Sequence, residues 1–197
     1  MYQKNDMPAK YLEGIVAHPI VQFYFEFVHL KQLYRQGWRL RGVPEDKCES
    51  VADHSFGTGV LAYVVANEYF PSLDASKVLL LATFHDLCEA HGGDPTPHDN
   101  IPPEVKSAKE SAAIKKLFRS LPQGQKYVQI WEEYEEQKTP EARFVKEIDR
   151  LEMALQAAVY EKQGREDLEE FFPWVQQRVS SPKVKEILED LLRIRTE

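Results

Sequence analysis

Four residues of this chain have the types and the setting of metal ligands. His85 and Asp86 are adjacent and follow the apolar run Val78–Phe84, which predicts a helix buried on most sides. Ionisable side chains that enter such a helix must be paired, hydrogen-bonded or bound to a metal, because burying an unpaired polar group costs roughly 2–7 kcal/mol. His54 lies upstream and Asp149 downstream, in two other predicted helices. We therefore expect a metal site assembled from three helices.

The expected ligand set offers two imidazole nitrogens and two carboxylates. Such a mixture suits a divalent ion, and the ligand types alone do not choose among manganese, cobalt, magnesium, zinc, nickel and iron. An ion there would lower the pKa of bound water toward about 7 and polarise a phosphoryl oxygen. Simpler interpretations remain open at this point. His54 could be a core histidine, and Asp149 could pair with Arg143 or Arg150.

Two further acids follow the His-Asp pair. Glu89 comes four residues after His85 and three after Asp86, so on a helix it lies on the same side, one turn on. It could bind a second ion or act as a general acid or base. Asp94 follows Gly92-Gly93 at the start of a proline-rich segment. The alternatives are a solvated helix charge for Glu89 and simple turn formation for Asp94.

The composition excludes several classes of protein. With 197 residues, 43% of them hydrophobic and 29% charged, the chain is typical of one folded globular domain. A net charge of -7 argues against broad binding to nucleic acid polymers or anionic membranes. Cys48 and Cys88 predict reduced thiols in the cytoplasm rather than a disulfide framework. The apolar runs are shorter than the ~20 residues that span a bilayer, so we expect no membrane segment.

The spacing of apolar residues predicts an all-α fold, a helical bundle that forms a single domain over residues 1–197. No alternating pattern of the kind that predicts a β-strand is present. Glycine and proline mark the expected loops at 37–44 and 92–103. Asp74 is the expected N-cap of the helix that carries His85 and Asp86. The expected helices are 8–17, 19–34, 50–69, 75–91, 104–119, 127–137, 141–162, 166–179 and 182–195.

Longer strings around these residues match a known family. His54, His85-Asp86 and Asp149 resemble the H…HD…D signature of the HD-domain metal-dependent phosphohydrolases. Within that family the chain is most similar to the small HD-domain 5′-deoxynucleotidases, over about residues 20–195. The strings that carry this resemblance are GWRLRGV, ESVADHSF, FHDLCEAHGGDPTP, DNIP, IWEEYEEQKTPEARFVKEIDRLEM and LQAAVYE.

The resemblance implies an all-α HD domain that hydrolyses deoxyribonucleoside 5′-monophosphates, a role in nucleotide metabolism, and a homodimer. It implies that His54, His85, Asp86 and Asp149 hold the primary ion. Where family members bind a second ion, the matching positions here are Glu89 and Asp94. By the same resemblance, Glu89 takes part in catalysis, Asp94 contacts the sugar, and Trp38 lies near the sugar and excludes the ribose 2′-hydroxyl.

The chain departs from the family pattern at one position. Some bacterial members carry an arginine immediately before the tryptophan, where it is implicated in phosphate binding, and here that position is Gly37. Other cations must then be considered for the phosphate. The sequence offers Arg41 and Lys106 as the predicted substrate-binding cations, with Arg39 and Lys109 close to them.

Other functions share these features. The chain could be a different HD enzyme, either a phosphodiesterase, a guanosine-polyphosphate hydrolase, or a di-iron oxygenase that needs iron at both sites. It could also be a non-catalytic module that binds a nucleotide without releasing phosphate. Metal dependence and phosphate release distinguish these alternatives.

Overall fold

The computed structural model describes residues 1–164 and 168–195 and confirms the all-α prediction. Within these residues no β-strand occurs, and β-pairing is limited to two isolated bridges, one of which joins Tyr34 to Ser50. The chain forms two compact units. The first unit contains residues 1–55 and 83–132, and the second contains residues 56–82 and the described residues from 133 onward. That residues 1–197 act as one domain stays a prediction.

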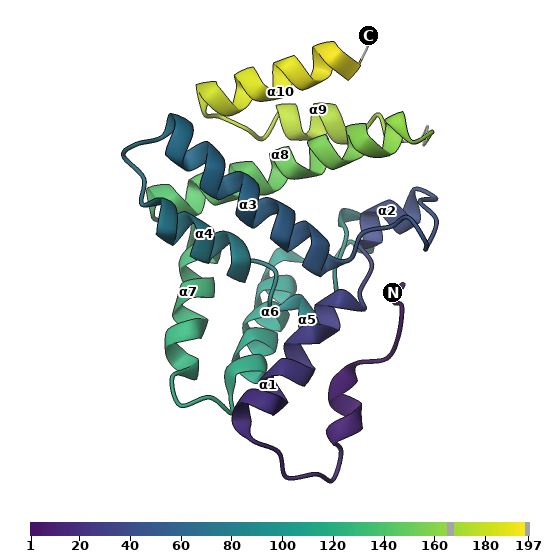
Figure 1. Ribbon diagram of the computed structural model, residues 1–197, viewed down its shortest axis with the longest axis vertical. Coiled ribbons are helices and arrows are strands. Elements are labelled where there is room, and N and C mark those ends of the chain that lie inside the picture. Colours follow the sequence, from purple (N-terminus) through teal and green to yellow (C-terminus); the bar gives the residue numbers. More distant parts are fainter. Residues whose placement is uncertain (165–167, 196–197) are drawn as a thin grey trace. The chain divides into compact units, whose positions relative to one another are not determined.

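Helices account for most of the described chain (Figure 1). The 3₁₀ helices are η1 (Pro8–Leu12), η2 (Val28–Lys31) and η3 (Pro97–Asp99). The α-helices are α1 (Pro19–Phe27), α2 (Gln36–Leu40), α3 (Val51–Tyr69), α4 (Ala75–Phe84), α5 (Glu89–Gly92), α6 (Pro103–Phe118), α7 (Gly124–Glu136), α8 (Pro140–Lys162), α9 (Phe171–Gln176) and α10 (Pro182–Arg195).

The core of the first unit forms where α5 and α6 pack against each other and against α1. Ile114 and Leu117 lie one turn apart on α6 and are almost fully buried, as the 3.6-residue period predicts. Phe118 stacks on Phe23 of α1, with ring centroids 5.5 Å apart. Trp131 belongs to the same cluster of buried side chains. The short helix α5 is thereby held in place directly after the His-Asp pair.

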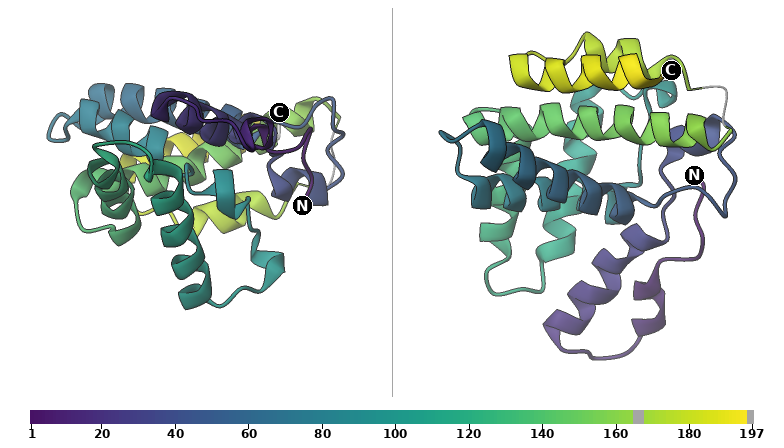
Figure 2. Two further views of the ribbon diagram at one scale, coloured as in Figure 1. Left: turned by 90° about the horizontal axis from the view of Figure 1, so that it is seen from below. Right: turned by 45° about the horizontal axis from the view of Figure 1, so that its top comes forward.

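The second unit is built along α8, the longest helix. Thr139 caps its N-terminus by accepting a hydrogen bond from the Ala142 amide, and Pro140 occupies the first turn, where its missing amide proton has no cost. Helices α9 and α10 both pack against α8 and against each other, as Figures 1 and 2 show. Phe172 and Leu188 are among the side chains that α9 and α10 bury.

Several predicted boundaries were wrong. The expected loop at 37–44 begins inside helix α2, and the expected helix 8–17 is only the short 3₁₀ helix η1. The expected helix 75–91 is interrupted, because α4 ends at Phe84 and residues 85–88 form a turn before α5. The start of the predicted helix 166–179 lies outside the described residues. The boundaries near 50–69, 104–119 and 182–195 were predicted to within one residue.

Within the described part of the chain, no helix combines the length and the apolar character needed to cross a membrane.

Candidate metal centre

His54 lies in the first turn of α3 and is fully buried. The start of this helix is fixed by a reciprocal cap. The Ser50 amide donates to Asp53 Oδ2 at 2.8 Å, and the Asp53 amide donates to Ser50 Oγ at 3.2 Å. Side chains that satisfy the first amides of a helix in this way define where it begins. The cap therefore sets the position of the imidazole one residue further on.

His85 and Asp86 lie in the turn between α4 and α5, not within a helix as predicted. The Trp131 indole Nε1 donates to the His85 carbonyl oxygen at 3.1 Å, and the Glu89 amide donates to the Asp86 carbonyl oxygen at 3.0 Å. Both carbonyls of the pair are therefore used by neighbouring groups. A turn with its main chain fixed in this way can direct two adjacent side chains toward the same point, which adjacent helical residues do less readily.

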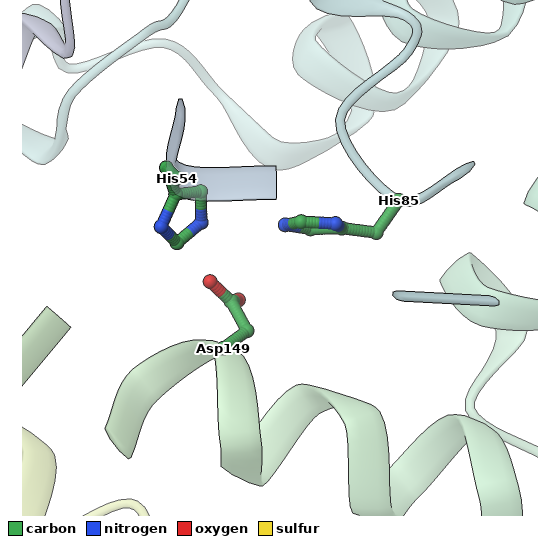
Figure 3. Close-up of side chains that lie close together, drawn as sticks. All are labelled: His54, His85 and Asp149. Carbon is green, nitrogen blue, oxygen red and sulfur yellow. The ribbon is translucent and has the colours of Figure 1, made fainter. Parts of the chain in front are cut away.

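Two buried imidazole rings face one carboxylate. His85 Nε2 is 3.2 Å and His54 Nε2 is 3.7 Å from Asp86 Oδ2, and the two ring centroids are 5.4 Å apart. Figure 3 shows the two rings. Burial acts to raise the pKa of Asp86, but His85, Arg35 and His54 outweigh it and hold that pKa well below its usual range. Asp86 is therefore an ionised carboxylate held between imidazole nitrogens, which is a donor set for a divalent cation.

Glu89 opens α5 and is buried. Arg35 Nη1 lies 4.0 Å from Glu89 Oε1. Within the described residues, Glu89 Oε2 accepts no hydrogen bond. Burial first, and then the charges of Asp86 and Asp94, raise the pKa of Glu89 well above its ordinary value. A carboxyl group in this setting is a better proton donor than an exposed glutamate, and binding of a cation nearby would relieve its unfavourable burial.

Asp94 is also buried, and both of its carboxylate oxygens are bound. Oδ1 accepts a hydrogen bond from Arg35 Nη1 at 2.9 Å, and Oδ2 accepts one from the Gln36 amide at 2.7 Å. Burial raises the pKa of Asp94, and Arg35 opposes the rise. The structure thus brings Asp86, Glu89 and Asp94 together around Arg35, a residue that the sequence analysis missed.

The predicted substrate residues lie in different settings. Trp38 of α2 is buried, and its indole Nε1 donates to Glu49 Oε1 at 2.6 Å. Arg41 Nη2 lies 2.9 Å from His98 Nε2 at an exposed position. Lys106 pairs with Glu110 one turn away on α6, at 3.3 Å, and its side chain is half exposed.

Asp149 lies on α8 in the second unit. The Tyr134 hydroxyl donates to Asp149 Oδ2 at 3.3 Å, and Lys146 Nζ is 3.5 Å from the same oxygen. Arg143 and Arg150, the predicted alternative partners, donate hydrogen bonds to main-chain carbonyl oxygens. Asp149 therefore offers the carboxylate oxygens of a metal ligand. In the described part of the chain, neither Arg143 nor Arg150 forms the alternative ion pair with it.

The residues of the first unit fit a divalent metal ion. They offer two imidazoles beside an ionised carboxylate, with a further carboxylate, Glu89, whose Oε2 is buried without a hydrogen bond in the described part of the chain. Nitrogen and oxygen donors of this kind suit zinc, manganese, cobalt, nickel or iron, and they do not select one of them.

Comparison with known proteins assigns the chain to a family. A model of the HD domain matches residues 27–191, so the chain belongs to the HD-domain family. It is 36% identical over 190 residues to the bovine protein named 5′-deoxynucleotidase HDDC2, covering 93% of this chain and 89% of that protein. It is 36% identical over 184 residues to 5′-deoxynucleotidase hdd1 of Schizosaccharomyces pombe, covering 89% of this chain and 90% of that protein.

A solved structure shares the fold. The crystal structure of the PH0347 protein from Pyrococcus horikoshii OT3 is 32% identical and superimposes with a TM-score of 0.73, covering 88% of this chain and 98% of that one. The family prediction made from the HD pair and its neighbouring strings is therefore confirmed.

Proposed function

We propose that this chain hydrolyses deoxyribonucleoside 5′-monophosphates to deoxyribonucleosides and phosphate, with the help of a divalent ion. The observation that carries this proposal is the arrangement of His54 and His85 around Asp86, beside the buried acid Glu89. The match to the two relatives named 5′-deoxynucleotidase extends over most of this chain and most of theirs. Their names therefore support the substrate class.

We propose His54, His85, Asp86 and Asp149 as the ligands of the primary ion. Asp86 lies against the imidazoles of His54 and His85, and Asp149 supplies the fourth position of the signature that the chain resembles. When bound, a divalent ion lowers the pKa of water and offsets the charge of a phosphoryl group. In the family that the chain resembles, the residues that hold a second ion are at the positions of Glu89 and Asp94. Since both oxygens of Asp94 are already bound by Arg35 and Gln36, we favour Glu89 for any such role.

The chain's own groups account for the remaining chemistry. Water attacks the phosphorus atom, the bond between phosphorus and the 5′-oxygen breaks, and the leaving oxygen takes a proton. Glu89 is the proposed source of that proton, because its raised pKa favours the protonated form. Trp38 is the proposed contact to the deoxyribose, held in one orientation by Glu49. Such a reaction depends mainly on positioning and charge stabilisation.

Phosphate release tests the proposal. The protein is stripped of metal, and Mn²⁺, Co²⁺, Mg²⁺ or Zn²⁺ is restored separately, with a deoxynucleoside monophosphate and its ribose counterpart assayed side by side. We expect metal-dependent release from the deoxy substrate. Equal release from both substrates would keep the hydrolase and reject the sugar-selecting role of Trp38. No release with any metal would reject the proposed function in favour of a binding module or, if the protein purifies with iron, an oxygenase.

We also propose that the protein is a homodimer whose copies meet through α3. Phe56, Val60, Tyr63 and Val64 follow one side of this helix and are exposed. The opposite side buries apolar residues such as Val65, and no charged side chain occurs between His54 and Asn67. A helix that is apolar on both sides is expected to be covered on both sides. An uncharged apolar face is self-complementary, so a second copy is the fitting partner despite the net charge of -7.

The oligomeric state tests this surface. Light scattering coupled to size exclusion is expected to give the mass of two chains of 22.9 kDa. Val60→Lys should shift the protein toward the monomer. Val159→Lys is the matched control, because Val159 of α8 is 47% exposed and Val60 is 48% exposed. A dimer that survives Val60→Lys would place the interface elsewhere.

We place the protein in the cytoplasm, in keeping with its two buried thiols, Cys48 and Cys88.

A further inference from the structure

Residues 1–4, here called the N-terminal strap, lie against the segment that leads into helix α2. Gln3 and Leu33 form an isolated antiparallel bridge, and the Lys4 amide donates to the Gln32 carbonyl oxygen at 2.6 Å. The strap precedes the part of the chain that matches the HD domain. Membership of the family therefore does not explain why these residues are held in place.

The buried side chain of Gln36 clamps the strap at the start of α2. Its Oε1 accepts a hydrogen bond from the Tyr2 amide at 2.6 Å, and its Nε2 donates to the Tyr2 carbonyl oxygen at 2.8 Å. The same nitrogen donates to the Tyr34 carbonyl oxygen at 2.7 Å. An amide side chain offers two donor protons and an acceptor oxygen, and here main-chain groups engage all of them. Replacing Gln36 by an apolar residue would break three hydrogen bonds at once.

Aromatic contacts extend the strap to the far end of α2. The guanidinium carbon of Arg39 lies 4.9 Å from the centre of the Tyr2 ring and 5.6 Å from the centre of the Tyr34 ring. A guanidinium group over an aromatic face at such distances is attracted to it. The strap therefore contacts α2 through Gln36 and through Arg39, which lie on either side of Trp38 in the sequence.

The strap also reaches the segment that follows α5. The terminal methyl group of Met1 packs against Gly93, in the space that a Cβ atom would occupy in any other residue at this position. The next residue, Asp94, accepts a hydrogen bond from the Gln36 amide at 2.7 Å. The strap thus lies across the junction between the start of α2 and the end of α5.

The position of α2 is not secured by the helix itself. It has only five residues, Gln36–Leu40, and a helix this short is not stable without contacts from the rest of the fold. Trp38, the proposed contact to the deoxyribose, moves with it. Excluding a 2′-hydroxyl is a matter of steric fit, and a displacement of about 1 Å changes the rate of an enzyme by up to about 100-fold.

We propose that the N-terminal strap positions α2 so that Trp38 distinguishes deoxyribose from ribose. This inference rests on the proposed hydrolysis of deoxynucleoside monophosphates and extends it to residues outside the matched domain. Tyr2 and Gln36 are positioning residues, because they act through α2 and not on the substrate. Loosening the strap therefore changes the selectivity for the sugar and leaves the affinity for the metal as it is.

The test compares kcat/KM for a deoxynucleoside monophosphate with kcat/KM for its ribose counterpart in the manganese-loaded protein. Gln36→Leu should lower the ratio of the two values by about tenfold, because α2 is no longer fixed. Tyr2→Ala should lower it by about threefold through the loss of the contact with Arg39, and Tyr2→Phe, which keeps the ring, should retain the wild-type ratio. The matched control is Tyr11→Ala, since Tyr11 of η1 is 69% exposed, and this variant should behave as the wild type.

Hydrogen exchange measured by mass spectrometry reports on the strap without any reaction. Gln36→Leu should speed the exchange of residues 33–43 and leave the exchange of α6 and the affinity for Mn²⁺ within about twofold of the wild type. If residues 33–43 exchange as in the wild type, the strap does not hold α2 and the proposal is wrong. If their exchange becomes faster while the ratio for the two sugars stays the same, the strap is only structural and the proposal is also wrong.

The wild-type protein separates this inference from the proposed function. If it releases no phosphate from any nucleotide, the hydrolase is rejected, and the ratio of the dissociation constants of the two nucleotides then takes the place of the kinetic ratio in the same comparison. If it treats both sugars equally, the inference is rejected and the hydrolase stands. If it selects the deoxy substrate and Gln36→Leu does so equally well, the inference alone is rejected.

Discussion

The first unit contains two clusters of charged side chains, and they differ in the balance of positive and negative charge. The first, here called the acidic cluster, consists of Asp86, Glu89 and Asp94 around Arg35. The second, here called the triad, consists of Glu26 with His91 and Arg119. In the triad, Arg119 donates to the two oxygens of Glu26 at 2.6 and 2.9 Å, and His91 Nε2 lies 2.8 Å from Glu26 Oε2.

This difference in charge balance is the reason why the acidic cluster, and not the triad, belongs to the proposed site. Each oxygen of Glu26 has a cationic or imidazole donor, so the triad is complete without any ligand. The acidic cluster places three carboxylates around one guanidinium group, and Glu89 Oε2 has no hydrogen bond within the described residues. An excess of buried negative charge is unfavourable in the absence of a cation. Such an excess is therefore better explained by a bound ion than by the stability of the fold.

The largest effect that separates the two clusters is expected for His85→Ala. The imidazole faces Asp86 at the centre of the proposed ligand set, so its removal should abolish tight metal binding and lower kcat/KM by roughly 1000-fold or more. Calorimetric titration with Mn²⁺ and phosphate release from a deoxynucleoside monophosphate measure the two effects.

The matched control for His85→Ala is His91→Gln in the triad. His91 lies six residues further along the chain and is also a histidine paired with a carboxylate. We expect this variant to bind manganese as the wild type does. If both histidine variants lose the metal equally, the distinction between the clusters is wrong.

The sequence analysis singled out the acids of the acidic cluster and missed its arginine. His85 and Asp86 were proposed because two ionisable residues at the end of an apolar run have few structural explanations, and His54 was proposed from the spacing of the whole H…HD…D pattern. Arg35 lacks such a signal, because the pattern of the family places its arginine at the position of Gly37 and the other nearby cations follow Trp38. A turn that brings residue 35 against residue 94 has no periodic signature in the sequence. The available signal was only that Arg35 precedes the motif by two residues.

The triad could not have been found from the sequence. Glu26 lies on α1 and Arg119 directly follows the end of α6, 93 residues further along, and the sequence allows an exposed charge at either position. Their meeting depends on how α1 packs against α6, which is decided by aromatic contacts such as that between Phe23 and Phe118. The turn at 85–88 was missed for a similar reason, because apolar periodicity continues through it.

A smaller effect is expected from breaking the triad. Arg119→Ala leaves the buried carboxylate of Glu26 with His91 alone and should lower the free energy of unfolding by roughly 1–2 kcal/mol. This is less than for a fully buried pair, since the Arg119 side chain is 53% exposed and water screens its charge. Denaturant titration measures the loss, and manganese affinity should not change. A tenfold loss of manganese affinity would show that the triad positions α5 for metal binding.

The smallest expected effect is a change in how stability depends on pH, and it distinguishes the two clusters without any metal. Because the pKa of Glu89 is raised in the folded protein, the folded state holds this proton more tightly than the unfolded chain. From its ordinary pKa upward, the free energy of unfolding of the metal-free protein therefore falls as pH rises, by less than about 1.4 kcal/mol per pH unit.

Glutamine does not titrate, so Glu89→Gln should remove this decline from denaturation curves recorded between about pH 5 and 8. The exposed Glu104 of α6 provides the matched variant Glu104→Gln, which should follow the wild type across that range. The contributions of His29 and His91, whose pKa values burial lowers, are common to all three proteins and cancel in the comparison. If Glu89→Gln and wild type lose stability in parallel as pH rises, Glu89 is not an uncompensated acid, and the acidic cluster is as well balanced as the triad.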